Sequence, residues 1–254
     1  MKVTLEQSKK IVEEIKKRTA KECYKFDLSN ENALLTDTKL SGLPYMPVGE
    51  EFPKDKNGND MVLLAQINFK DIKLKNYPEK GIFQIFVQSE VSWPTETKTR
   101  YYEDISLPAR ADLEFKPMEE FVQKEFKLNV EKTVTSMPIN DYRFDKLFQD
   151  VTEEIAGERI EFYDLAEEIY DDYNMYKALD TDFGLIGGYA DFSVKDPRNN
   201  STDKSYDECL IKVYSGLDMN NIIIGDEGHF WVLIKEEDLK ICNFENVSYD
   251  WDCL

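Results

Sequence analysis

The sequence predicts an α+β fold that is mainly antiparallel β, with two pseudo-symmetric repeat units and flanking helices. Three observations lead to this prediction. Apolar runs of strand length occur twice in each of two regions, glycines stand at matching places ahead of them, and two segments show helical periodicity. Hydrophobic residues make up 41% of the 254 positions, which is enough to bury a sizeable core. We therefore expect a single domain over residues 1–254.

The first predicted element is an N-terminal helix over about residues 4–20. Thr4 and Gln7 stand three residues apart and form a capping-box pair, which satisfies two amide donors at the start of a helix. Charged residues surround one apolar stripe, made of Leu5, Ile11, Val12 and Ile15. A half-buried strand is expected next, because apolar and charged residues alternate from Tyr24 to Leu28.

The most informative pattern is a repeat with a period of about 146 residues. Gly42 opens the first copy and Gly188 opens the second, and each is followed by an apolar strand. These first strands cover residues 63–67 and 209–213. A second strand, led by a glycine, follows in each copy at residues 81–87 and 228–234.

These matches define repeat unit one over about residues 40–110 and repeat unit two over about residues 185–254. The glycines permit the tight turns that lead into the strands. Two strands alone cannot bury their apolar faces, so we expect the two units to cover each other and to share one continuous core.

An acidic helical insert is predicted between the units, over about residues 150–178. Residues 150–172 contain ten carboxylates and a single base, Arg159. Apolar residues recur at helical spacing through this segment and form one face. Four carboxylates lie on another face, and they are either a solvated surface or an oxygen cluster for calcium or magnesium: Glu161, Asp164, Glu168 and Asp171.

The formal net charge of −19 limits the classes of partner. A chain this acidic repels phosphate backbones and anionic lipid, so we expect neither nucleic acid nor membrane as a partner. The charge serves solubility or attracts a basic protein. The first ten residues lack the apolar core of a signal peptide, and no stretch approaches a membrane span, so we expect a cytoplasmic protein with reduced thiols.

The residues that carry most enzyme chemistry are scarce. The four cysteines form no C-x-x-C pair and His229 is the only histidine, which argues against a zinc site. A Cys209–His229 pair would need neighbouring strands that share a face. The repeat aligns these two residues with Leu63 and Ile82, which favours core packing. We therefore predict no catalytic, metal or cofactor residues and no bound cofactor, and we lean against an enzyme.

Four stretches of the chain carry a family resemblance. They are Gly42-Leu43-Pro44 with Phe52-Pro53 and residues 63–67; Gly187-Gly188-Tyr189 with Asp196-Pro197-Arg198; Gly225-Asp226-Glu227-Gly228; and residues 249–253. In these stretches the sequence resembles the YwqG-like family of bacterial proteins, a domain of unknown function. The resemblance implies a mainly antiparallel α+β fold with duplicated β units, and it supplies no reaction. The family's association with toxin–immunity loci implies protein binding.

The sequence departs from the YwqG-like pattern at three positions. Phe52 stands where the family usually has tryptophan, Val194 where it has glutamine, and Lys212 where it has a second strand glutamine. Only Gln66 remains of the strand-glutamine pair. Any ligand role that the resemblance implies for those glutamines is therefore incomplete in this chain.

A candidate binding patch is expected where the two units meet, because ligand sites prefer such interfaces. Turn formation is the competing explanation for its aspartates. The candidates are Gln66, Asp196, Arg198, Asp226 and Asp252. Our leading hypothesis is an intracellular protein-interaction module with a protein partner, which we expect to be basic; an immunity or antitoxin-like role is one form of it. The alternative is a small-molecule or metal-binding protein, or a weak enzyme, that uses the cleft between the units.

Overall fold

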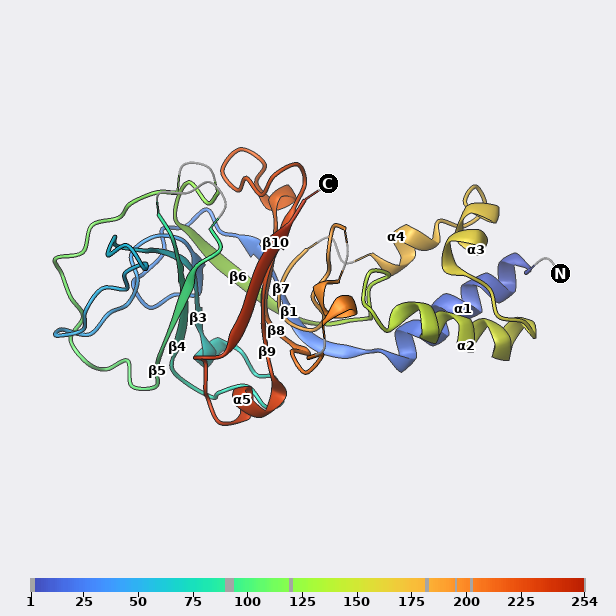
Figure 1. Cartoon of the computed structure of the whole chain (residues 1–254), viewed down its shortest axis with the longest axis horizontal. Coiled ribbons are helices and arrows are strands. Elements are labelled where there is room, and N and C mark those ends of the chain that lie inside the picture. Colours follow the sequence, from blue (N-terminus) through green and yellow to red (C-terminus); the bar gives the residue numbers. More distant parts are fainter. Residues whose placement is uncertain are drawn as a thin grey trace.

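A mostly antiparallel sheet forms a nearly closed barrel, and a lobe of helices stands beside it (Figure 1). The computed structural model describes residues 3–89, 94–118, 121–180, 183–194, 196–201 and 203–253. The helices are α1 (Leu5–Arg18), α2 (Phe144–Ala156), α3 (Phe162–Glu168), α4 (Met175–Leu179) and α5 (Glu236–Lys240). Helices α1 to α4 make up the helical lobe, whereas α5 lies against the barrel (Figure 1). No helix within the described ranges has both the length and the apolar character needed to cross a membrane.

The barrel is one sheet of ten strands in the order β10-β9-β8-β7-β1-β6-β2-β3-β4-β5. Every pairing between these strands is antiparallel. The strands are β1 (Lys21–Leu28), β2 (Lys39–Leu40), β3 (Val62–Asn68), β4 (Ile82–Val87), β5 (Thr97–Tyr102), β6 (Phe126–Thr135), β7 (Gly184–Gly187), β8 (Glu208–Tyr214), β9 (His229–Ile234) and β10 (Val247–Asp252). The central β1–β6 pair is flanked by β2 to β5 on one side and by β7 to β10 on the other.

The two edge strands, β5 and β10, approach each other through the segment that leads into β10. The hydroxyl of Thr99 in β5 donates a hydrogen bond of 2.6 Å to the carbonyl oxygen of Phe244. The ring of Phe244 also packs against Tyr101 of β5 and Phe69, with centroid separations of 4.9 and 5.8 Å. These contacts bring the edges together at one end and nearly close the barrel.

The strands that belong to the predicted units share a local irregularity. The β3–β4 register shifts between Leu63 and Ala65, and the β8–β9 register shifts between Cys209 and Ile211. A bulge of this kind bends its strand and increases the twist, which helps a sheet to curl. Each bulge therefore marks the same place in its hairpin.

The largest apolar cluster draws residues from both predicted units. Leu64 and Phe83 come from β3 and β4, whereas Leu210 and Phe230 come from β8 and β9, and all four are buried. The expected continuous core is therefore present in the barrel. A separate cluster holds the helical lobe together and contains Ile11, Val12 and Ile15 of the predicted α1 stripe with Phe148 and Phe162. Leu5, the fourth predicted member of the stripe, is exposed instead.

The glycines that open the predicted units adopt the backbone that turns require. Gly42 has a φ of 86° and Gly188 a φ of 71°, a left-handed region that side chains with a Cβ rarely enter. A Cβ on Gly188 would also stand 2.7 Å from the methyl group of Thr135 in β6. Both glycines are thus needed to bring the chain from a strand into a tight turn.

Candidate functional site

The five predicted patch residues lie in separate environments. Gln66 is buried in β3, where its side-chain oxygen accepts bonds from the Tyr45 amide and from Gln84 and its nitrogen donates to two carbonyls. All of these partners belong to the first half of the barrel. Gln66 therefore connects neighbouring segments of the barrel wall and has no polar atom left for a ligand.

Asp226 and Asp252 lie apart from Gln66, in the second half of the barrel. Asp226 is exposed in the turn before β9. Asp252 is in β10, opposite His229 of β9, and accepts a bond of 3.0 Å from the Val194 amide. The structure brings only Asp196 and Arg198 of the five residues into direct contact with each other.

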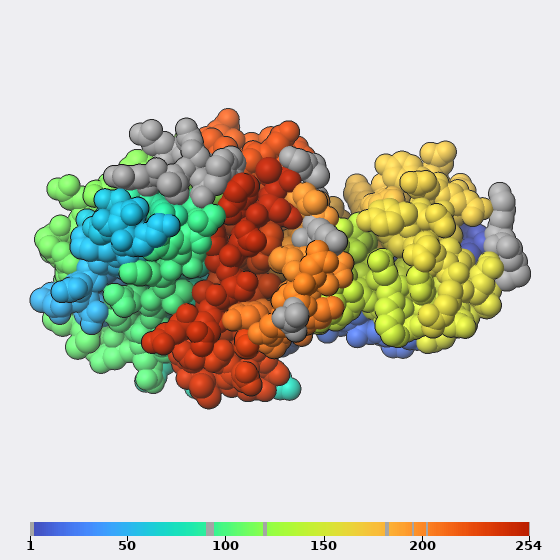
Figure 2. Space-filling model, viewed as in Figure 1, coloured from blue at the N-terminus to red at the C-terminus, as the bar shows by residue number. Residues whose placement is uncertain are grey.

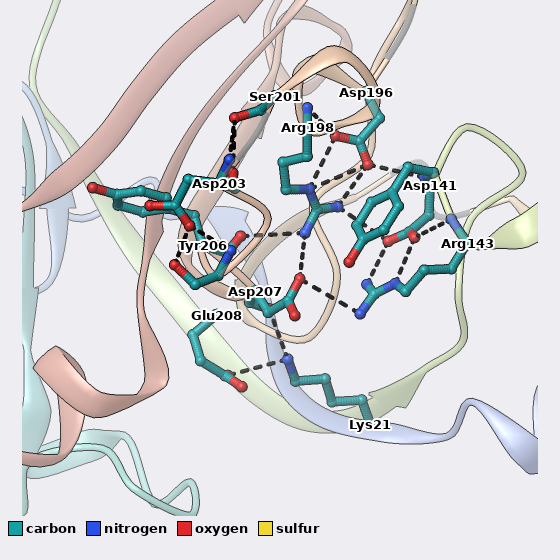
Figure 3. A network of polar contacts seen from close by, with 12 residues as sticks. Lys21, Asp141, Arg143, Asp196, Arg198, Ser201, Asp203, Tyr206, Asp207 and Glu208 are labelled. Atoms are coloured by element: carbon teal, nitrogen blue, oxygen red, sulfur yellow. Dashed lines mark hydrogen bonds and ion pairs between the residues drawn. The ribbon is translucent and has the colours of Figure 1, made fainter.

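Arg198 is the centre of a buried ionic network, which we call the Arg198 cluster: Asp141, Arg143, Asp196, Arg198 and Asp207 (Figure 3). The Arg198 side chain is 6% exposed. Its guanidinium nitrogens donate to Asp196 at 2.8 and 3.0 Å, to Asp141 at 3.1 Å and to Asp207 at 3.0 Å. A fourth acceptor is the Tyr206 carbonyl at 3.2 Å, so every nitrogen of the planar guanidinium group donates at least one hydrogen bond.

The Asp196-Pro197-Arg198 sequence builds this geometry locally. Asp196 caps the short 3-10 helix Pro197–Asn200, and its carboxylate accepts the Arg198 amide at 2.8 Å. Proline fits the first position of such a turn because its φ is fixed and it needs no amide partner. The same carboxylate also accepts the Arg198 guanidinium, so one short turn supplies two of the five members of the cluster.

Two further members of the cluster, Asp141 and Arg143, come from the segment that leads into the helical lobe. Arg143 donates two bonds to Asp141, at 2.6 and 2.7 Å, and the Tyr142 amide donates to Asp196 at 3.0 Å. Burial alone raises the pKa of the Asp141 carboxyl. The hydrogen bonds and positive charges of Arg143 and Arg198 outweigh burial and hold that pKa below its usual value. The cluster therefore joins the lobe to the barrel through paired charges, and sequence analysis missed its Asp141 and Arg143 members.

Lys21 of β1 extends the network along the barrel. Its ammonium group lies 3.1 Å from Glu208 of β8 and donates to the Asp207 carbonyl at 3.2 Å (Figure 3). Each of the three carboxylates of the cluster contacts at least one of its two arginines. We interpret the Arg198 cluster as a structural link between the lobe and the barrel.

The Cys209–His229 pair, which sequence analysis disfavoured, does not form. In the β8–β9 register Cys209 is opposite Leu233, and His229 is opposite Tyr214 at the other end of the hairpin. Burial raises the pKa of the Cys209 thiol to about 12, so it stays protonated near neutral pH. Cys209 packs in an apolar cluster as expected. The expectation that His229 packs in the core is wrong, because its side chain is half-buried and lines a pocket.

That pocket, which we call the joint pocket, lies between the helical lobe and the barrel and has a volume of about 540 Å³. Its walls come from the segment before α2, from α4, from residues 191–193 and from the start of β9. The Ser193 hydroxyl and the Nδ1 of His229 are 2.8 Å apart. The Asn140 side chain donates to the backbone carbonyl of Phe192 at 2.6 Å, which connects the segment before α2 to residues 191–193.

The outer surface of the lobe carries a second notable feature, which we call the α3 face. All of its members are exposed, and they are Tyr163, Asp164, Glu167, Tyr170, Asp171 and Asp172. Figures 1 and 2 place this segment, in yellow, on the lobe and away from the barrel. Within the described residues, none of these four carboxylates forms an ion pair, and no group of three or more acidic, histidine or cysteine side chains is placed to hold a metal ion.

On the neighbouring helices α1 and α2, most carboxylates lie in ion pairs. Glu14 and Glu154 both contact Arg18, and Asp150 contacts Lys146 at 2.6 Å. Arg159 contacts Asp150 and Glu153. Within the described part of the chain, five of the seven carboxylates of α1 and α2 therefore lie in ion pairs, whereas the four of the α3 face do not.

Comparison with known proteins adds a family and no activity. A search of curated proteins found no match. The model of a family described as a domain of unknown function, DUF1963, matches residues 38–253, which include β2 to β10 and helices α2 to α5. Because the match covers most of the molecule, the chain belongs to the DUF1963 family.

Proposed function

We propose that this protein is a protein-interaction module whose α3 face docks a basic partner protein. The observation that carries the proposal is the set of exposed, unpaired carboxylates on that face, beside helices on which most carboxylates lie in ion pairs. A surface of one charge sign attracts a partner of the other sign and speeds their encounter. An immunity or antitoxin-like role within a YwqG-like family is one form of this function.

Exposed aromatic residues support docking at the same place. Tyr163 and Tyr170 each leave 53% of their surface exposed, among carboxylates. Tyrosine is enriched in protein interfaces because it supplies a large rigid contact area and a hydroxyl group. A partner with basic and apolar groups would contact both kinds of side chain.

We also propose that the barrel consists of two duplicated units on either side of the β1–β6 pair. The matching strand order, the bulges at Leu64 and Leu210, and the glycines at residues 42 and 188 support this proposal. In this architecture helices α2 to α4 are an insertion between the units, packed with α1 in the lobe, and this insertion is free to carry a binding surface without disturbing the barrel.

The test compares two variants of equal charge as baits for partner capture. The first neutralises the α3 face with Asp164→Asn, Glu167→Gln, Asp171→Asn and Asp172→Asn. The matched control neutralises four exposed carboxylates of the barrel half, Glu50→Gln, Glu51→Gln, Asp226→Asn and Glu245→Gln. All eight residues are exposed, so both variants should fold, which circular dichroism would check.

We expect the wild type and the control to capture the same basic protein from cells that carry the gene. The α3 variant should bind this protein about tenfold more weakly, and raising the salt from about 50 to about 300 mM should weaken the wild-type complex. Equal binding by both variants, or an acidic partner held independently of salt, would contradict the proposal.

A further inference from the structure

We infer that the joint pocket receives a cationic side chain, arginine or lysine, of the basic partner that docks on the α3 face. This inference rests on the proposed function, since it assigns the partner an anchor residue. It starts from a contact between the two features: Tyr176 of α4 lines the joint pocket, and its ring centroid lies 6.2 Å from that of Tyr163 on the α3 face. The acidic surface and the pocket are therefore continuous through one aromatic side chain.

The size and location of the joint pocket fit the side chain of an anchor residue. Its volume of about 540 Å³ falls within the range typical of ligand sites, which often lie between structural bodies. The Tyr176 ring is fixed because it also packs edge-on against the buried ring of Phe162, at 5.2 Å. The aromatic face of Tyr176 would support the flat guanidinium group or the alkyl stem of a long basic side chain.

The charges around the pocket favour a cation. Asp180 lies on the lobe side and Glu227 on the barrel side, both exposed, and the lining also includes Asp191. The basic residues among the described lining are Lys177 and His229, against the three carboxylates. The buried ammonium of Lys212 lies 3.8 Å from Asp191 and balances that carboxylate, so the attraction comes mainly from the two carboxylates at the rim.

The test uses a small probe in place of the unidentified partner. The probe is n-butylguanidinium, which reproduces the end of an arginine side chain, and its neutral control is n-butylurea. The full-length protein, labelled with ¹⁵N, is titrated with each compound, and the amide shifts are followed by NMR. We expect saturable shifts around Tyr176, Ser193 and His229 with n-butylguanidinium and none with n-butylurea.

Two substitutions in one turn distinguish binding in the joint pocket from non-specific attraction to negative charge. Glu227 lines the pocket, whereas Asp226 beside it does not, and both are exposed. Glu227→Gln should weaken n-butylguanidinium binding about two- to fivefold, the range expected for one exposed charge pair, and Asp226→Asn should leave it unchanged. Equal effects of the two substitutions, equal binding of n-butylurea, or no saturable shift at the pocket would overturn the inference.

The outcome also distinguishes this inference from the proposed function. If the α3 variant loses its basic partner while n-butylguanidinium leaves the pocket unshifted, the docking function stands and the anchor assignment fails. If the probe fills the pocket while the α3 variant keeps its partner, the proposed docking surface is wrong, and the anchor assignment to that partner fails with it.

Discussion

Arg198 shows how one residue holds two parts of the molecule together. Its guanidinium bridges Asp196 and Asp207 of the barrel half and Asp141 of the segment entering the lobe. The rings of Tyr142 and Phe192 lie 5.1 and 5.6 Å from the guanidinium carbon. Removing the Arg198 guanidinium is costly because Asp196, 1% exposed, would stay buried without its cation, and Asp141 and Asp207 would keep only Arg143.

Replacing Arg198 with glutamine should therefore lower the free energy of unfolding by about 3–5 kcal/mol. Arg198→Lys keeps the charge but loses the planar guanidinium group, so its decrease in the free energy of unfolding should be smaller than that of Arg198→Gln but still measurable. The control is Arg159→Gln, whose side chain is 52% exposed and whose ion pairs should contribute about 1 kcal/mol or less. Urea unfolding measures all three, and similar losses for Arg198→Gln and Arg159→Gln would contradict the structural role of the cluster.

The Asp141 carboxyl predicts a pH dependence. Its pKa is lower in the folded protein than its ordinary value, so its charge stabilises the folded state above that ordinary value. This contribution is lost as the pH falls through the lowered pKa. Between about pH 5 and about pH 2, stability should fall less in Asp141→Asn than in the wild type. The exposed control Asp164→Asn should keep the wild-type profile, and a Asp141→Asn profile parallel to the wild type would refute the assignment.

Sequence reasoning identified single residues of the site only where local geometry decides their role. Asp196 and Arg198 were predictable as polar neighbours around a proline, because one short turn places both. Asp141 and Arg143 lie more than fifty residues earlier, and only the folded chain brings them to Arg198. Gln66 was predicted as a ligand residue, but its place in a buried strand directs its polar atoms to the backbone.

Helix α1 is the element whose boundaries were most readily predicted. Thr4 accepts the Gln7 amide at 3.2 Å, and Gln7 accepts the Thr4 amide at 3.0 Å, as a capping box requires. Gln7 also donates to the Ile155 carbonyl at 3.2 Å, which attaches the start of α1 to the end of α2. The cap thus orders the end of the helix and the contact between two helices.

Thr4→Ala should lower the free energy of unfolding by about 0.5–2 kcal/mol, because it removes the side-chain acceptor of the cap. Thr4→Asn keeps an acceptor and should stay within a few tenths of a kcal/mol of the wild type. Thermal unfolding of the two variants provides the comparison. Equal stability of Thr4→Ala and the wild type would show that the cap contributes nothing to the fold.

Strands were predictable where apolar runs are long, or where apolar and charged residues alternate as in β1. Strands β3, β4, β8 and β9 are almost wholly buried and read as continuous apolar segments. The central strand β6 was missed, because six of its ten residues are charged or polar and most of its positions are at least partly exposed. Its place beside β1 depends on long-range pairing, which no local pattern specifies.

At the scale of the whole molecule, the barrel and the lobe each have their own apolar cluster. The barrel cluster and the lobe cluster share no residue, and the Arg198 cluster spans the region between them. The sequence predicted a single domain with an acidic insert. It could not place the insert as a lobe beside the barrel, because that arrangement depends on contacts between residues far apart in the chain.

Hydrogen–deuterium exchange of the complex with the captured basic partner tests the central claim most directly. Binding at the α3 face would shield amides and slow their exchange across residues 161–177, which include α3 and the start of α4. We predict that this segment gains the strongest protection in the complex. Protection confined to the barrel strands and their loops, with residues 161–177 exchanging as in the free protein, would contradict the account.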